Sequence, residues 1–215
     1  MRKLTYFIGM TIDGCIAGPD DEFEFMVAHS ALDADYSAAL VAAYPDAMPT
    51  PARPYVGLGP DNRDFDTVLM GRGSYEPGLK QGMTSPYAHL EQYVVSKSLT
   101  TSPDPGVTVF SGDPVELVRE LKAREGKGIY LCGGGNLAGQ LRDEIDELVV
   151  KIYPFVAGNG IRLFDAEFSP EQYELKESRT FKNGVLLVRY AKPAADGSRP
   201  KGRGELRGRP QRARK

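Results

Sequence analysis

The sequence predicts an α/β fold, in which a mixed, mainly parallel sheet with antiparallel C-terminal strands is flanked by helices. Three observations predict it: short apolar runs alternate with helix-like segments, glycine turns end several of the runs, and an Asn-Gly pair separates the last two β-prone runs. The chain has 215 residues, of which 41% are hydrophobic and 26% charged. This size and composition favour one globular domain and exclude a wholly disordered chain.

The first predicted strand covers residues 3–10, which are rich in aromatic and β-branched residues. Asp13-Gly14 follows it and is typical of a turn. The apolar run is too short to span a membrane, and no cleavage-site pattern follows it. We therefore expect a protein of the reducing cytosol.

An alanine-rich stretch from Asp33 to Tyr44 predicts a helix. Five prolines follow in residues 45–63, and proline cannot continue a helix interior. We predict that residues 45–63 form an irregular insertion in a domain covering residues 1–192. Such a long insertion is often a pocket wall or a lid, and it can also serve a contact between subunits of a homodimer.

Three short apolar runs, at residues 67–70, 93–95 and 107–110, are each predicted to be buried strands. The clearest helix signal follows the third run. Asp113 is suited to cap the helix, Pro114 suits its first position, and the next apolar residues are spaced for one buried face. A strand, a helix and a further strand in succession predict parallel pairing.

The next predicted strand, residues 129–132, runs into three consecutive glycines and then a helix over residues 136–142. Glycines at the end of a strand allow backbone N–H groups to approach an anion, and the N-terminus of the next helix adds partial positive charge. The alternative is a tight turn that needs a positive φ angle. After this helix, residues 148–155 are strand-like, and Asn183-Gly184 predicts a closing hairpin.

Polar residues also follow two other predicted strands. Gly71, Arg72 and Ser74 come after one, with Ser74 able to cap a helix, and Ser96-Lys97 comes after another. Each group alone is more often a solvated turn. Because α/β sheets bind ligands at the carboxyl ends of their strands, the three polar strand ends together predict one anionic ligand.

The loop after the first strand offers a further candidate. Ile16 and Ala17 could form a small apolar lip, and Asp13 is either a proton donor or only a turn former. The two cysteines and two histidines show no metal-ligand spacing, so no metal site is expected.

Basic residues are concentrated at the end of the chain. The last 19 residues hold 8 of the 27 basic residues and one acid, which leaves 19 basic and 28 acidic residues in the remainder. We expect residues 193–215 to be a basic, disordered tail. The acidic body argues against a nucleic-acid partner, although the tail could contact nucleic acid nonspecifically.

In order and spacing, these segments resemble the dihydrofolate reductase superfamily, most closely the branch that holds the reductase domain of riboflavin biosynthesis. The matching segments are residues 11–17, 67–76, 94–97 and 129–136. The resemblance implies a three-layer fold that binds NADPH across the strand ends. The positions that it assigns to the cofactor are Ile16, Ala17, Gly71, Arg72, Ser74, Ser96, Lys97, Gly133, Gly134, Gly135 and Asn136.

The resemblance also implies roles within that set. Arg72 and Lys97 would face the adenosine 2′-phosphate, Ser74 and the glycine turn would hold the diphosphate, and Ile16 with Ala17 would pack on the nicotinamide. Asn136 stands where some relatives carry a basic residue.

The expected function is an NADPH-dependent reductase of a small substrate, either a pyrimidinedione-like heterocycle or an activated carbonyl or imine. Folate-reducing relatives hold the pterin with an acid on the first helix. Residues 19–63 align poorly with those relatives, so neither Asp33 nor Asp35 can be equated with this acid, and dihydrofolate is expected to react poorly. The proton could come from Asp13, from an acid of the insertion or from water. The alternatives are a dinucleotide-binding or sensing domain that has lost catalysis, and a nucleic-acid partner acting through the tail.

Overall fold

The computed structural model describes residues 1–193. The strands of the main sheet are β1 (Leu4–Thr11), β3 (Phe65–Gly71), β4 (Glu91–Val95), β5 (Val107–Phe110), β6 (Gly128–Gly133), β7 (Glu147–Tyr153), β9 (Glu174–Thr180) and β10 (Leu186–Ala191). Two short strands, β2 (Cys15–Ala17) and β8 (Ile161–Arg162), pair in a second small sheet that the sequence did not predict.

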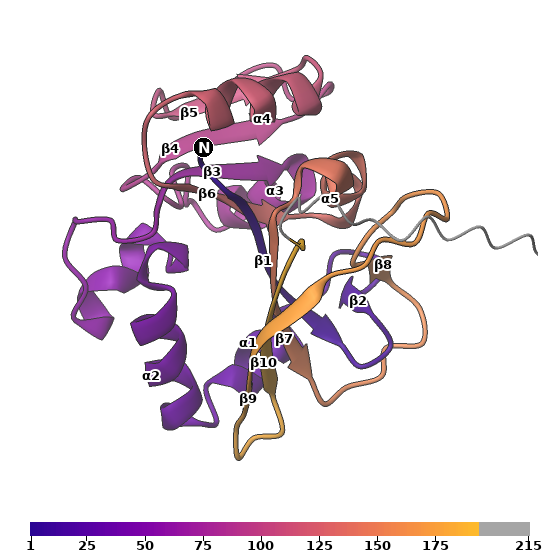
Figure 1. The fold of residues 1–215 in the computed structure, drawn as a ribbon. Coiled ribbons are helices and arrows are strands. Elements are labelled where there is room, and N and C mark those ends of the chain that lie inside the picture. The colour runs from indigo at the N-terminus through magenta and orange to yellow at the C-terminus, as the bar shows by residue number, and fades with distance from the viewer. Residues whose placement is uncertain (194–215) are drawn as a thin grey trace, which may run out of the picture.

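The main sheet has the order β5-β4-β3-β6-β1-β7-β10-β9 (Figure 1). The strands from β5 to β7 run parallel, whereas β10 is antiparallel to β7 and to β9. The carboxyl ends of the six parallel strands therefore meet at one edge. The predicted mixed sheet with antiparallel C-terminal strands is confirmed.

The helices are α1 (Glu24–Ser30), α2 (Ala34–Ala43), α3 (Arg72–Lys80), α4 (Pro114–Ala123) and α5 (Gly135–Gln140), with 3-10 helices η1 (Pro45–Ala47), η2 (Thr50–Val56) and η3 (Arg142–Glu144). Helix α4 begins at the predicted proline, and the carboxylate of Asp113 accepts the N–H of Val115 at 2.8 Å. Helix α2 agrees with its prediction, whereas α1 was not predicted.

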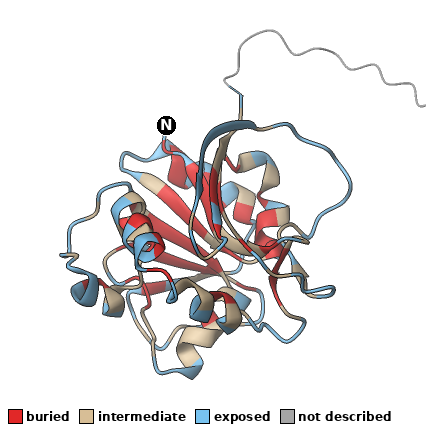
Figure 2. Ribbon diagram, turned by 90° about the horizontal axis from the view of Figure 1, so that it is seen from below, coloured by how far each residue is buried: buried red, intermediate tan, exposed pale blue. Residues whose placement is uncertain are grey.

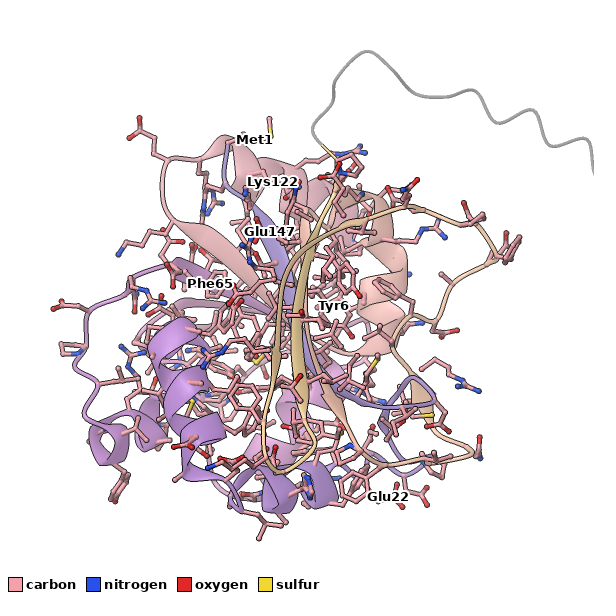
Figure 3. The ribbon with its side chains drawn as sticks, turned by 60° about the horizontal axis from the view of Figure 1, so that its bottom comes forward. Met1, Tyr6, Glu22, Phe65, Lys122 and Glu147 are labelled. Atoms are coloured by element: carbon pink, nitrogen blue, oxygen red, sulfur yellow. The ribbon has the colours of Figure 1, made fainter. Side chains whose placement is uncertain are left out.

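The two faces of the sheet carry separate apolar cores. Tyr6 belongs to the core covered by α4 and α5, and Phe65 belongs to the core covered by α3 and the end of α2. Figure 3 places these two residues on opposite sides of the central strands. In Figure 2 the central strands are buried, whereas every residue of the edge strand β9 is exposed. This layering confirms the helix-flanked sheet.

The insertion over residues 45–63 is irregular outside two short 3-10 helices, which the sequence did not predict. It contains η1 and η2, and two buried charged residues bind its backbone. The fully buried carboxylate of Asp46 accepts backbone N–H groups of residues 63–65, and the guanidinium of buried Arg53 donates to three backbone carbonyls of the insertion. Asp46 Oδ1 lies 3.9 Å from Arg53 Nη1. These long-range contacts replace the regular helix that proline forbids.

The closing hairpin is confirmed, since Gly184 has a φ angle of +81° in the turn between β9 and β10. The predicted basic tail, residues 193–215, lies outside the described part of the chain except for Pro193. Within residues 1–193, no helix is long and apolar enough to cross a membrane.

Candidate functional site

A cavity of about 1270 Å³ opens along the carboxyl ends of the parallel strands. It has two parts. The strand-end part is formed by the loops that follow β3, β4, β5 and β6. The helix-covered part lies over β1 and β7 and is covered by α1, α2 and the insertion.

The residues that the sequence assigned to a cofactor converge on this cavity. All of them except Gly133 line it: Ile16, Ala17, Gly71, Arg72, Ser74, Ser96, Lys97, Gly134, Gly135 and Asn136. They come from four loops that are distant in sequence, and the parallel sheet brings these loops to one edge. Asp13 is not in the cavity wall.

Glycine allows the loops after β3 and β6 to touch. A Cβ atom at Gly71 would lie 3.4 Å from the carbonyl oxygen of Gly133 and from the nitrogen of Gly134. Gly133 has a φ angle of +129°, which side chains disfavour, and a Cβ there would lie 3.3 Å from Ser74 Oγ. Ser74 does not cap α3 as predicted, because α3 begins two residues earlier with Gly71 at its N-cap. Its hydroxyl instead faces the glycine turn.

Gly135 has a packing role. A Cβ atom at this position would lie 2.0 Å from the carbonyl oxygen of Arg162, so no other residue fits without moving backbone. The carbonyl of Gly135 also accepts the N–H of Asp165 at 3.0 Å. The third glycine of the turn therefore holds the segment after β8 against α5.

The strand-end part carries charges of both signs. Arg72 is half-exposed, with Nε 3.6 Å from the carboxylate of Glu76, and within residues 1–193 Lys97 has no ion-pair partner. Two carboxylates also line the cavity, Asp21 and Asp113, and the latter accepts the backbone N–H that starts α4. Both cations are therefore accessible to an anion from solvent.

The side chain of Asn136 is occupied by its neighbours. Its Nδ2 donates to the carboxylate of Asp165 at 3.2 Å, and its Oδ1 accepts from Gln140 at 2.9 Å. Asn136 lines the strand-end part, but these bonds leave it one free amide hydrogen for a ligand.

Asp13 joins two loops. Its carboxylate accepts the hydroxyl of Thr11 at 2.6 Å and the N–H groups of Ala157 and Gly158 at 3.0 and 2.7 Å. These hydrogen bonds, with that of Thr11 the strongest, lower the pKa of Asp13 to about 2. Asp13 is thus ionised at neutral pH and has no proton to donate, which agrees with the alternative of a turn former.

The helix-covered part is mainly apolar and aromatic. Its floor on the sheet is formed by Phe7, Gly9, Tyr130, Cys132, Lys151 and Tyr153. Its cover is formed by Met26, Ser30, Leu40, Tyr44, Met48, Pro49 and Tyr87. Lys151 is the one charged residue of this set.

Lys151 is partly buried, and its Nζ lies 4.3 Å from the centroid of the Phe7 ring. Burial lowers the pKa of Lys151 to about 8, and the thiol of Cys132, when ionised, opposes this effect. Within residues 1–193, its ammonium has neither an ion-pair partner nor a hydrogen-bond acceptor. The other polar groups of the floor are hydrogen-bonded or uncharged at neutral pH, so they are less available to bind a ligand.

The hydroxyl of Tyr153 is already committed. Ser30 donates to the carbonyl of Met26 at 2.9 Å, so its oxygen is left to accept from Tyr153 at 2.7 Å. The oxygen of Tyr153 in turn accepts from Tyr36 at 2.9 Å. This chain fixes the Tyr153 ring over Gly9, where a Cβ atom would lie 2.9 Å from the ring.

The thiol of Cys132 lies 3.8 Å from the hydroxyl of Tyr87. Burial raises the pKa of the Cys132 thiol and of the Tyr87 and Tyr130 hydroxyls, so all three are neutral at physiological pH. Cys15 is buried outside the cavity wall. Among residues 1–193, no three His, Cys, Asp or Glu side chains are grouped to hold a metal ion.

Sequence reasoning predicted that the insertion could form a pocket wall, and Met48 and Pro49 do line the cavity, but it missed the rest of the helix-covered part. One signal was present, because Lys151 places a charge within the apolar run of residues 148–155. A lysine in a buried strand needs a partner or a function. No comparable signal marks Met26 or Tyr153, whose place in the cavity depends on the unpredicted α1.

Comparison with known proteins agrees with this architecture. The profile of the RibD C-terminal domain family matches residues 2–187. Two similar proteins of Bacillus subtilis are both described as uncharacterized: YwjB is 27% identical over 188 residues, covering 86% of this chain and 96% of YwjB, and YyaP is 24% identical over 203 residues, covering 88% and 94%.

Two solved structures share the fold. A putative riboflavin biosynthesis protein of Shewanella sp. PV-4 superposes with a TM-score of 0.66 at 20% identity, over 90% of this chain and 99% of that one. A diaminohydroxyphosphoribosylaminopyrimidine deaminase/5-amino-6-(5-phosphoribosylamino)uracil reductase of Thermotoga maritima gives 0.56 at 13% identity, over 89% of this chain and 57% of that one. With its dihydrofolate reductase-like sheet and a family match along nearly its whole length, the chain belongs to the RibD C-terminal domain family.

Proposed function

We propose that the protein is an NADPH-dependent reductase that transfers hydride to a small, flat substrate, either a pyrimidinedione-like heterocycle or an activated carbonyl or imine. One observation carries this proposal. A single cavity joins a glycine-rich, cation-bearing strand edge to an aromatic chamber under α1 and α2. A dinucleotide needs the first part, and the ring that it reduces needs the second.

The residues of the strand-end part fit NADPH. Arg72 and Lys97 offer two accessible cations for a phosphate monoester, and the glycine turn with Ser74 leaves backbone open to a diphosphate. Ile16 lies beside the glycine turn, since its Cδ1 would lie 3.8 Å from a Cβ at Gly134. Ile16 and Ala17 are therefore suited to pack against the nicotinamide.

Bound NADPH would supply the hydride, and the protein would position the two rings and exclude water. Three candidate acids are poorly suited to supply the proton. Asp13 is ionised outside the cavity, and the insertion's buried Asp46 is saturated by backbone N–H groups. Asp33 caps α2 through the N–H of Tyr36 and lies outside the cavity wall. We propose water or the Lys151 ammonium as the proton donor to the ring bound in the helix-covered part.

The substrate class is supported by similarity alone. The Thermotoga protein is described as a reductase of a substituted uracil, but this chain spans 57% of its length at 13% identity. A pyrimidinedione is therefore the first compound to test and not the only one.

Two measurements test the proposal. Fluorescence titration should show that NADPH binds at least about tenfold more tightly than NADH, because one charge-assisted contact contributes about 1.5–3 kcal/mol. NADPH oxidation should proceed with a pyrimidinedione of the riboflavin pathway or with a small activated carbonyl, and not with dihydrofolate. Absence of dinucleotide binding would contradict the proposal, and binding without turnover of any compound would favour a sensing domain.

A further inference from the structure

The helix-covered part contains a cation that nothing in the fold explains. Lys151 is in the middle of β7, between Gly9 of β1 and Leu187 of β10 in the sheet register. Its ammonium faces the cavity and, within residues 1–193, contacts only the ring of Phe7 among groups that favour a cation. Taking a lysine out of water costs free energy, and such residues are ordinarily paired.

The charged and titratable groups around Lys151 do not compensate it. Cys132 and Tyr130 of β6 line the same part of the cavity, both with raised pKa values. So does Tyr44 at the end of α2, whose pKa burial raises to about 12. From β10 the next residue on this face is Arg189, which lies 3.9 Å from the carboxylate of Glu147. No carboxylate reaches Lys151.

The side chains around Lys151 are suited to contact a flat ring. Because Gly9 has no side chain, the Tyr153 ring lies directly over it beside the ammonium: a Cβ atom at Gly9 would lie 2.9 Å from this ring and 3.7 Å from the sulfur of Met26. The rings of Phe7 and Tyr44 lie 4.9 Å apart along another side, tilted by 41° to each other, and Met26 of α1 covers the top. Thioether and aromatic surfaces of this kind pack well against a planar ring.

We propose that Lys151 is the specificity-determining residue of the helix-covered part, where its ammonium binds the ionised or strongly polarised oxygen of a flat ring. The favoured ligands are aromatic carboxylates, enolates and acidic cyclic imides, and cationic rings are rejected. This inference deepens the proposed function, because it specifies the class of substrate that the reductase would take.

The test uses two probes of equal size and opposite charge. Benzoate and benzamidine are titrated separately against the full chain by ligand-observed NMR at about pH 6.5, below the lowered pKa, where Lys151 is charged. We expect benzoate to bind at least about tenfold more tightly than benzamidine, in line with a charge-assisted contact. Equal binding, or binding of neither probe, would overturn the proposal.

Variants assign the effect to one residue. Lys151→Met, which keeps the length of the side chain, should remove the preference for benzoate, and Lys151→Arg should retain it. Lys97→Met tests whether benzoate binds in the strand-end part instead, and loss of binding in this variant alone would overturn the proposal. Lys176→Met is the matched control, because Lys176 is a strand lysine on exposed β9, 2.5 Å from its Glu174 partner.

The result can be separated from that of the proposed function. NADPH titration of Lys151→Met should match the wild-type chain within about twofold, since Lys151 lies outside the strand-end part. If NADPH fails to bind while the preference for benzoate depends on Lys151, the anionic-ring site stands and the reductase proposal fails. If NADPH binds and the preference is absent, only the Lys151 proposal fails.

Discussion

The two parts of the cavity are built in opposite ways. The strand-end part consists of loop backbone, small residues and accessible charges such as Arg72 and Lys97, and it offers many weak contacts along an extended edge. The helix-covered part is enclosed by aromatic and apolar side chains around one cation, Lys151. The first construction suits a long, polyanionic ligand, and the second suits a small ring. The difference shows how one sheet can offer one region suited to a long cofactor and another suited to select a small substrate.

The largest expected effect concerns the wall of the helix-covered part. Asp46→Ala leaves the buried guanidinium of Arg53 without its carboxylate and three backbone N–H groups without an acceptor. Breaking a buried ion pair typically costs about 3–5 kcal/mol of unfolding free energy. Urea denaturation measures this loss. Asp61→Ala, an exposed aspartate of the same insertion, should change stability by about 0.5 kcal/mol or less.

An Asp46→Ala protein as stable as the control would show that the insertion is held by apolar contacts alone. It would also remove the reason for treating η1 and η2 as a rigid wall.

The next effect concerns the strand-end part. The double variant Arg72→Ala, Lys97→Ala should lose most of the preference for NADPH over NADH, because it removes both accessible cations. The affinity for NADPH should fall by about tenfold or more, and the affinity for NADH should change little. Fluorescence titration measures both. Equal losses for the two nucleotides would place these side chains away from the 2′-phosphate.

A third prediction concerns the pH dependence of the helix-covered part. Because burial lowers the pKa of Lys151 to about 8, its ammonium is present below this pH and is lost above it. The affinity for benzoate should therefore fall as the pH rises through about 8, while benzoate itself stays ionised. Lys151→Arg should bind equally well at about pH 6.5 and about pH 9.5, since arginine stays protonated. A wild-type midpoint near the ordinary lysine value would show that the ammonium is solvated.

The smallest effect is expected at Asp13. Asp13→Asn removes the charge and one acceptor that join the first turn to residues 157–158, so the melting temperature should fall by a few degrees. NADPH affinity and any turnover should stay within about threefold of wild type. Loss of turnover with an unchanged melting temperature would identify Asp13 as the proton donor after all.

The strand-end part was accessible to sequence reasoning because each of its pieces is local. A strand, its terminal glycines and the next helix are contiguous, as at residues 128–140, and Asp113 with Pro114 marks a helix start within two positions. Parallel pairing then requires these ends to meet. The resemblance to a family with the same order of segments added the roles, and the family itself is confirmed.

The helix-covered part was not accessible because its contacts are long-range. Asp46 and Arg53 hold the insertion through hydrogen bonds to backbone groups. These groups are not adjacent to Asp46 and Arg53 in sequence. The importance of Lys151 depends on the register that places it opposite Gly9 and beside Phe7. A pattern of apolar residues predicts a strand there, but it does not specify which cavity the one charged residue faces.

The central claim is that one ligand extends from the strand-end part to the threshold of the helix-covered part. A crystal structure of the chain with NADP⁺ tests this most directly. We predict the adenosine phosphate between Arg72 and Lys97, the diphosphate at Ser74 and the glycine turn, and the nicotinamide against Ile16, with its free face toward Lys151. A dinucleotide bound elsewhere, or one whose nicotinamide points away from Lys151, would contradict the account.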